Sequence, residues 1–302
     1  MIPNAKELQL ISIYLYISEI YDKKLRYYCE RFSNNSLPEF TDQEIITIYL
    51  FAMHYEQKYK ISHIYQFASG YLRSWFPKLP SYVAFNTRLN RLGEALRLLS
   101  ANLLETFQPD DCSKTESLLD SLPIITCSGK RTGKVATDIT DKGYCSTKNM
   151  YYFGVKLHAV GYARPSRLPF PEHIVISPAS ENDFNIFRQN WSNIPNRIFY
   201  GDKIYYDHEF FDWLAKHMNS FMCTPVKAIK GQAANIKYID KAANDLFSTA
   251  VSRVRQPIEA LFNWLIEKTD IQRASKVRST KGLFVHIFGR IAATYIFLIF
   301  NS

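Results

Sequence analysis

The sequence predicts a sheet domain of the α/β or α+β class at residues 111–302, preceded by a helical N-terminal domain at residues 1–110. Three observations indicate this organisation. Apolar residues recur at helical spacing up to about residue 108. A polar, turn-rich stretch, "QPDDCSKT", follows at residues 108–115. Beyond it, short apolar runs alternate with helical patterns, as in sheet domains flanked by helices. We therefore place the domain boundary within residues 108–115.

The N-terminal region carries two clear helix signals. "TDQEIITIYLFAMHY" opens with Thr41 and has Glu44 three residues later, which is a capping-box pattern. "SYVAFNTRLNRLGEALRLLSANLLETF" predicts an amphipathic helix. Its apolar stripe consists of leucines: Leu89, Leu92, Leu96, Leu99 and Leu103. Arg88 and Arg91 lie on the polar side near its start, and two interpretations stay open: a helix laid against DNA, or a bundle with a solvated basic face.

The region after residue 115 reads as strands and helices. Short runs rich in apolar, β-branched and aromatic residues predict strands at 117–125, 151–160, 172–179, 196–202 and 220–225. Helical patterns occupy 181–191, 208–218 and the stretch from about residue 251 onward. The segment 128–149 is rich in Gly, Lys, Thr and Asp. We expect it to be an exposed basic loop between the first two strands.

The charge balance favours a polyanionic partner. The chain of 302 residues has 37 Lys and Arg against 28 Asp and Glu, a formal charge of +9. Such an excess favours nucleic acid first, although charge alone is weak evidence. The five cysteines are odd in number and include no Cys-x-x-Cys spacing, which argues against a disulfide framework or a zinc ribbon. Reduced thiols in a cytoplasmic protein are the simpler expectation.

One apolar segment, "LFVHIFGRIAATYIFLIF" at residues 283–300, is nearly long enough to span a bilayer. It contains His286 and Arg290, and an Arg at the membrane centre costs about 3 kcal/mol even on the lenient insertion scale. We therefore expect a buried core helix and no membrane partner, with Arg290 reaching the surface or a carboxylate. The N-terminus lacks the pattern of a signal peptide.

Three carboxylates stand in contexts that suggest a metal site. Asp120 interrupts an apolar strand in "LLDSLPI", and Asp202 closes another in "IFYGDKIYYD". Glu259 lies in "SRVRQPIEALFNWLIEK", near the start of an amphipathic helix whose first turn would hold Pro257. Carboxylates that converge from strand ends and a helix suit Mg²⁺. Each residue has an ordinary alternative, as a turn cap, a lysine partner or a solvated helix edge, so the prediction depends on their agreement.

Four segments in order carry a resemblance to a known family: "LLDSLPIITC", "KNMYYFGVKLHAV", "RIFYGDKIYYD" and "SRVRQPIEALFNWL". The chain resembles the DDE transposases of bacterial insertion sequences, most of all the group named after insertion sequence 982. The resemblance covers most of the chain. It implies an RNase H-like fold, a mixed sheet flanked by helices and preceded by a helical N-terminal domain. Asp120 would lie on the first strand, Asp202 after the fourth, and Glu259 on the following helix.

The resemblance also implies an activity. Asp120, Asp202 and Glu259 would coordinate two Mg²⁺ ions, with Mn²⁺ as a substitute, that activate water and then a DNA 3′-hydroxyl for attack on phosphodiesters. Arg255 matches the family's basic residue four positions before the glutamate, and we expect it on the DNA backbone. Further expected phosphate contacts come from exposed basic positions: Lys203, Lys130, Arg131 and Lys134.

The predicted second strand adds two more candidates. Lys156 and His158 share one face of "YYFGVKLHAV", which would look toward the active site or DNA, or would belong to an ordinary half-exposed strand. The N-terminal domain would recognise the terminal inverted repeats, and two ends would require a homodimer or a larger assembly on DNA. The protein would act in the bacterial cytoplasm, associated with the nucleoid.

Two positions depart from the family pattern. Ile204 stands where related enzymes often have Gly or Ala, and Ile266 stands where many have Lys, with Lys268 two residues further on as a substitute. These departures keep two alternatives open. One is a catalytically inactive DNA-binding protein derived from a transposase. The other is an RNase H-like nuclease that cuts DNA without joining it.

Overall fold

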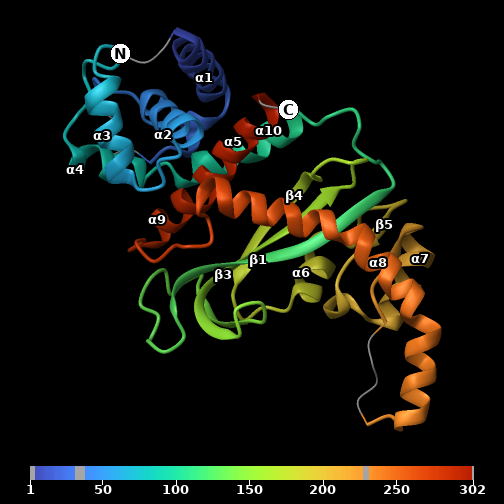
Figure 1. Cartoon of the computed structure of the whole chain (residues 1–302). Helices are drawn as coiled ribbons and strands as arrows, with labels where there is room; N and C mark the ends of the chain where they lie inside the picture. Colours follow the sequence, from blue (N-terminus) through green and yellow to red (C-terminus); the bar gives the residue numbers. More distant parts are fainter. Residues whose placement is uncertain (1–3, 31–37, 227–230, 301–302) are drawn as a thin grey trace. The chain divides into compact units, whose positions relative to one another are not determined.

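The computed structural model describes residues 4–226 and 231–300, apart from 31–37 (Figure 1). The chain forms two compact units. Unit 1 comprises residues 1–107, 134–138 and 265–302, and unit 2 comprises residues 108–133 and 139–264. The C-terminal residues therefore group with the N-terminal helices, whereas the sequence placed them in the sheet domain. A functional boundary at residues 110 and 111 stays a prediction.

Unit 1 is helical. Its α-helices are α1 Asn4–Lys23, α2 Asp42–Glu56, α3 Ile61–Tyr71, α4 Tyr82–Leu89, α5 Gly93–Thr106, α9 Thr280–Phe284 and α10 Arg290–Phe300. A 3-10 turn, η1 Leu25–Tyr28, follows α1, and a π-helical turn, η3 Val285–Gly289, joins α9 to α10. The capping box predicted at α2 is confirmed. Thr41 Oγ1 accepts the backbone N–H of Glu44 at 3.3 Å, and the Glu44 carboxylate accepts the N–H of Thr41.

The predicted leucine-rich helix is two helices, α4 and α5, with a break at residues 90–92. The side chain of Asn90 donates to the carbonyl of Asn86 at 2.8 Å, a local bond that competes with helix continuation. Gly93 then starts α5, where an added Cβ would lie 2.8 Å from Cβ of Phe284. The leucine stripe itself is buried as expected: Leu89, Leu92, Leu96, Leu99 and Leu103. The leucines form one buried face although the helix is interrupted, because α4 and α5 both contribute residues to that face.

The apolar C-terminal segment is a core helix of unit 1. Thr280–Leu298 has the length and composition of a membrane span, which is weak evidence, and 72% of its most apolar window is buried. Arg290 donates to the carbonyl oxygens of Thr269 and, at 2.8 Å, of Tyr59. His286 Nε2 contacts the Ile271 carbonyl at 2.8 Å. The expectation that Arg290 reaches the surface or a carboxylate is wrong, because it is buried and both of its terminal nitrogens donate to backbone carbonyls.

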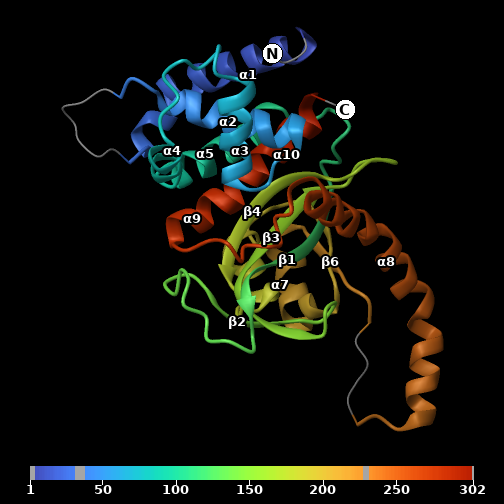
Figure 2. The same cartoon turned by 60° about the vertical axis from the view of Figure 1, so that its left-hand side comes forward.

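Unit 2 is built on a curled, mixed sheet (Figures 1 and 2). Its strands are β1 Glu116–Ser128, β2 Asp141–Cys145, β3 Met150–Tyr162, β4 Phe170–Pro178, β5 Ile198–Tyr200 and β6 Phe221–Cys223. Their order is β2-β3-β1-β5-β6, and β4 also pairs with β3. β1 runs antiparallel to β3 and parallel to β5, which runs parallel to β6. The predicted mixed α/β sheet is present, and it is compatible with an RNase H-like fold.

Helices flank this sheet. They are α6 Asp183–Asn190, α7 His208–Met218 and α8 Ala234–Thr269, with a short 3-10 turn, η2 Lys203–Tyr205. One core cluster joins the sheet to α6 and α7: Leu119, Val160, Phe187, Trp191, Phe199, Tyr205, Leu214 and Met222. Neighbouring strand residues point to opposite faces. Leu119 therefore faces α6 and α7, and Asp120 faces the other way, where Arg255 of α8 contacts it.

Two predicted boundaries are wrong. The predicted loop 128–149 contains β2, whose Tyr144 packs against Tyr151 of β3 with ring centroids 5.1 Å apart. Polar and glycine residues around β2 conceal this pairing, because the partner strand supplies the stabilising contact. α8 begins at Ala234 rather than near residue 251, so Pro257 lies inside the helix and not in its first turn.

Candidate carboxylate site on the sheet

Asp120 is the centre of the site. Its Oδ1 accepts the backbone N–H of Ser121 at 2.8 Å, and its Oδ2 accepts Nη1 of Arg255 at 3.0 Å. The side chain is 23% exposed. Burial raises the pKa of Asp120 to about 6, the Arg255 guanidinium opposes this rise, and Glu259 and Asp202 add to it. Asp120 therefore lies within electrostatic reach of both other predicted carboxylates.

Arg255 joins two of these carboxylates. It donates through Nη1 to Asp120 and through Nη2 to Oε1 of Glu259. Positions four apart on a helix share a face, so α8 presents Arg255 and Glu259 together. Arg255 is only 15% exposed, whereas Glu259 is 49% exposed. The guanidinium thus links α8 to β1 and offsets the negative charge of both carboxylates.

Asp202 approaches from the neighbouring strand. β5 pairs in parallel with β1, with Tyr200 opposite Leu118, so Asp202 follows β5 at the level of Asp120. Its Oδ1 accepts the backbone N–H of Ile204 and thereby caps the turn η2. The structure thus confirms that Asp202 caps a turn. This role leaves its second carboxylate oxygen for other partners.

Gly201 and Tyr205 hold this turn in place. An added Cβ at Gly201 would lie 2.7 Å from Cδ2 of Tyr205, so the tyrosine ring packs directly on the glycine backbone. Tyr205 is buried, and its pKa lies well above the usual value because of burial and the nearby Asp183, Asp120 and Asp202. Ile204, which departs from the family pattern, is exposed and leaves this packing undisturbed.

The donor chemistry of the site fits a divalent cation. Three carboxylates interact electrostatically, and two of them already share a positively charged group, Arg255. In the described parts of the chain, no group of three His, Cys, Asp or Glu side chains stands in metal-ligand geometry. The guanidinium lies between Asp120 and Glu259. Asp120, Asp202 and Glu259 are therefore suitable as ligands in chemistry, and Arg255 has to move for a metal to contact both residues that it bridges.

A buried ion pair on the opposite face was missed by the sequence analysis. Asp183 accepts Nζ of Lys156 at 2.8 Å and Oγ of Ser121 at 2.7 Å. Lys156 Nζ also donates to the carbonyl of Glu181 at 2.7 Å. Asp183 stands in the first turn of α6, where the helix dipole makes an acidic residue common, so its position alone does not mark it as a candidate. It connects α6 to Ser121, the residue next to Asp120.

Lys156 and His158 are therefore wrongly predicted as DNA contacts. His158 is completely buried, its Nε2 lies 2.8 Å from Oγ of Ser177, and burial lowers its pKa to about 4. Lys156 is largely buried against Asp183. Alternation along β3 correctly put both on one face. Residues of α6 and β4 cover that face. Alternation along a strand shows which residues share a face, but it does not show what packs against that face.

The other predicted DNA contacts fall into two groups. Lys203, Lys130, Arg131 and Lys134 are exposed. Arg88 is largely buried, and it donates to Asp42 Oδ1 at 2.6 Å and to the Phe40 carbonyl, so it holds unit 1 together instead of facing DNA. Arg91 is half-buried, and Lys268 lies 3.7 Å from Glu267 within unit 1. DNA contacts by the exposed group stay predictions.

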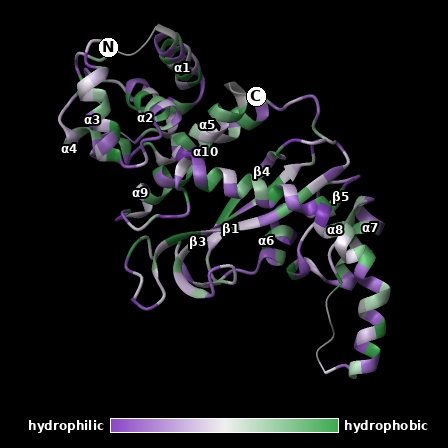
Figure 3. Cartoon of the chain, viewed as in Figure 1, coloured by the Kyte–Doolittle hydropathy of each residue, from purple (hydrophilic) through white to green (hydrophobic). Residues whose placement is uncertain are grey.

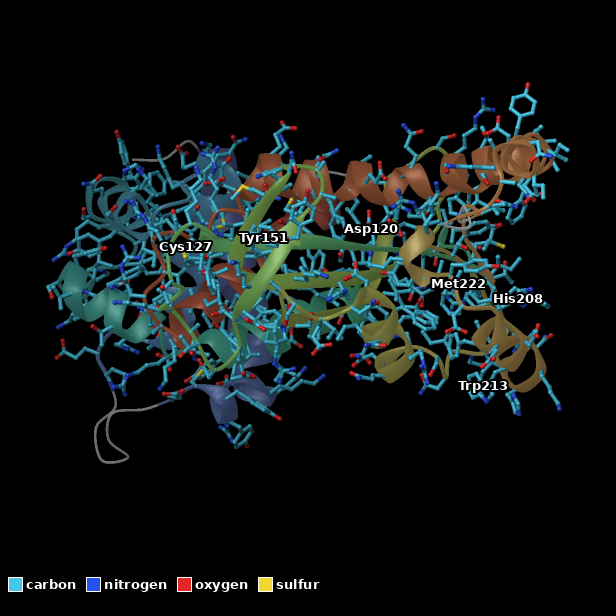
Figure 4. The ribbon with its side chains drawn as sticks, turned by 90° about the horizontal axis from the view of Figure 1, so that it is seen from below. Asp120, Cys127, Tyr151, His208, Trp213 and Met222 are labelled. Carbon is cyan, nitrogen blue, oxygen red and sulfur yellow. The ribbon has the colours of Figure 1, made fainter. Side chains whose placement is uncertain are left out.

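The mixed sheet with three carboxylates and an arginine defines a class, that of α/β domains with an acidic centre on the sheet. Figure 4 labels Asp120 where β1 passes beside α8. Residues 112–296, more than half of the chain, match the family model described as a transposase DDE domain, and the chain belongs to this family. No curated protein and no solved structure matches the chain. The family implies a transposase-type nuclease that acts on DNA with divalent metal ions.

Proposed function

We propose that the protein is the transposase of a bacterial insertion sequence that binds its terminal inverted repeats, cleaves DNA and transfers the strand ends to a target. The observation that carries the proposal is the convergence of Asp120, Asp202 and Glu259, from two strands and one helix, around Arg255. Family membership supports the same activity. The order of the four motif segments supports the group named after insertion sequence 982.

Asp120, Asp202 and Glu259 would hold two Mg²⁺ ions, with Mn²⁺ as a substitute. When bound, the ions would lower the pKa of the attacking hydroxyl and offset charge on the phosphoryl oxygens. The partly buried position of Asp120 would keep its carboxylate shielded from bulk water. Ser121 N–H would orient Oδ1. Turn η2 would hold Asp202 through its bond to the N–H of Ile204.

Arg255 would have two successive partners. Without metal it neutralises Asp120 and Glu259. With the carboxylates engaged elsewhere, its planar guanidinium is suited to bidentate contact with a DNA phosphate. Lys203, Lys130, Arg131 and Lys134 would add backbone contacts, which position DNA without reading its sequence. The N-terminal domain, residues 1–110, would read the terminal repeats. A homodimer or larger assembly on DNA would act in the bacterial cytoplasm, at the nucleoid.

The direct test is strand transfer on a labelled duplex that carries the element's own terminal repeat, with Mg²⁺. We expect joined product from the wild type and from Asp212→Asn, an exposed acidic residue on α7 outside the site. Asp202→Asn should give none. Cleaved but unjoined DNA from the wild type would identify a nuclease. Joining by Asp202→Asn at the wild-type rate would contradict the catalytic assignment.

A further inference from the structure

Helix α8 has two halves with different surroundings. Its C-terminal half packs within the protein through Val251, Ile258, Leu261, Phe262 and Leu265, which are buried. The described side chains between residues 234 and 250 are instead almost all exposed. Figures 1 and 2 show this half extending beyond the sheet of unit 2. The helix therefore offers a long face that no other described element covers.

This exposed half is apolar along one side. Ile239 is 64% exposed and Leu246 is 83% exposed, and hydrophobic residues recur along the helix in Figure 3. Apolar positions follow one another at intervals of three and four: Ile236, Ile239, Ala243, Leu246 and Ala250. We call these five residues the α8 seam. Alternating intervals of three and four are the spacing by which one helix packs along another.

The charge of the segment favours a protein partner over DNA. Between residues 234 and 250, Lys237 and Lys241 are balanced by Asp240 and Asp245, although the whole chain carries +9. A surface that binds the phosphate backbone needs an excess of cations, since phosphate contacts supply most of the affinity. The α8 seam combines exposed apolar side chains with no net charge. Its partner is therefore expected to present an apolar helix face.

The seam is complementary to itself when two copies run antiparallel. A two-fold axis between Ala243 and Leu246 places Ala243 of one copy against Leu246 of the other and Ile239 against Ala250, while Ile236, at the end of the seam, lies against Arg253. Each small residue then faces a large one, which is how well-packed helix interfaces fill space. In the same antiparallel pair each flank of the seam meets the same flank of the other copy: Asp240 meets the flank that holds Phe247, and the other flank holds Ala242 and Thr249, so no like charges oppose each other. Two-fold pairing of one surface with itself is also the commonest form of self-association.

We propose that the α8 seam is a self-association surface that binds the same seam of a second copy of this chain, antiparallel, about a two-fold axis. The proposal rests on the proposed transposase function, for which a dimer is expected, and it names the surface through which the two copies would bind. Its test requires neither DNA nor metal. Failure of strand transfer would leave it intact. Because Arg255 and Glu259 lie on the same helix, the seam would also join two carboxylate sites through one pair of helices.

Sedimentation equilibrium of the full chain without DNA tests the surface. We expect the wild type to form a concentration-dependent dimer. Leu246→Lys should weaken dimerisation at least tenfold, because a charge would enter the apolar seam. The matched control is Tyr238→Lys, since Tyr238 is 77% exposed on the same helix but points away from the seam. It should leave the dimer unchanged.

A mixing experiment tests the antiparallel register. Ala243→Glu and Leu246→Lys should each be monomeric alone. Mixed together they should recover dimers, because position 243 faces position 246 only in the antiparallel pair. Circular dichroism melts verify that each variant is folded. A wild type that stays monomeric, equal effects of Leu246→Lys and Tyr238→Lys, or mixed variants that stay monomeric would overturn the proposal.

Discussion

Arg255 Nη1 lies 3.0 Å from Oδ2 of Asp120, although the two residues are 135 positions apart in the sequence. The same guanidinium contacts Glu259 one helical turn away. A largely buried cation thus occupies the space between two carboxylates that we propose as metal ligands. Arg255 is an internal counterion, and this role can be separated from a role on DNA by measuring metal binding directly.

Arg255→Gln should tighten Mn²⁺ binding several-fold, because the metal no longer competes with the guanidinium for Asp120 and Glu259. Without metal the variant should lose about 1–3 kcal/mol of stability, since two carboxylates lose a charged hydrogen-bond partner. Isothermal titration with Mn²⁺ and thermal melts check both effects. Arg253→Gln, an exposed position on the same helix, is the control. Equal Mn²⁺ affinity in the wild type and Arg255→Gln would contradict the counterion role.

The ion pair between Lys156 and Asp183 should be costly to break from one side. Asp183→Leu leaves the Lys156 ammonium buried without its carboxylate, and we expect a loss of about 3–5 kcal/mol in the free energy of unfolding. Lys156→Met combined with Asp183→Leu should cost less than the sum of the single changes, because no buried charge is left unpaired. Urea denaturation of the four proteins measures this coupling. Additive losses would show that the pair does not interact.

His54 should make stability depend on pH. It is buried with no hydrogen-bond partner for either ring nitrogen among the described residues, and burial lowers its pKa to about 4. An unfolded histidine titrates near 6.5, so as pH falls from about 6.5 to 4 the unfolded state binds a proton that the folded state excludes. Stability is therefore lost on acidification, by about 2 kcal/mol at pH 5 from this residue.

Chemical denaturation at pH 7 and pH 5 measures this effect. His54→Leu should lose less stability between the two values than the wild type, because its side chain does not titrate. His158 and His286, whose pKa values burial also lowers, still contribute in both proteins. The exposed His208 supplies the control, and His208→Leu should behave as the wild type does. An unchanged pH dependence in His54→Leu would exclude His54 as a cause.

Two glycine substitutions should have opposite signs. In Gly201→Ala the new Cβ would lie 2.7 Å from the Tyr205 ring, so Tyr205 and turn η2 must shift, at a cost of about 1–3 kcal/mol. Strand transfer should fall because Asp202 caps that turn. Gly70→Ala in α3 meets nothing within 4 Å and should gain about 0.5–1 kcal/mol from helix propensity. Thermal melts of both proteins test the pair, and destabilisation by Gly70→Ala would contradict the packing argument.

The sequence correctly predicted those features that depend only on residues close together in the chain. The capping box at Thr41 and the buried leucine stripe required only neighbouring residues. The period of two in β3 placed Lys156 and His158 on one face. The covering of that face depends on α6, whose Asp183 is remote in sequence, so the same period led to a wrong prediction of DNA contact. The strand β2 was missed for a similar reason, since its stability comes from pairing with β3.

In the candidate site, too, features set by neighbouring residues were predicted, and contacts between distant segments were not. The contexts of Asp120 and Asp202 were visible because a carboxylate within or just after an apolar strand is unusual, whereas Glu259, on a helix edge, became a candidate only together with the other two. The bridge made by Arg255 was not predicted, because it depends on how α8 crosses β1. Nor was the full extent of α8 predicted: apolar residues at intervals of three and four continue back to Ile236, but two of the five are alanines, which give a weak signal.

The long sequence separation between β1 and α8 also affects when the two elements are synthesised. A ribosome adds about 5–20 residues per second, so roughly ten seconds pass between the synthesis of Asp120 and that of Arg255, 135 residues later. During that interval the nascent chain carries the first carboxylate without its helical partners. A chain released early, before α8, would lack both Arg255 and Glu259. Under the proposed function, prematurely terminated copies would lack one of the three proposed metal ligands.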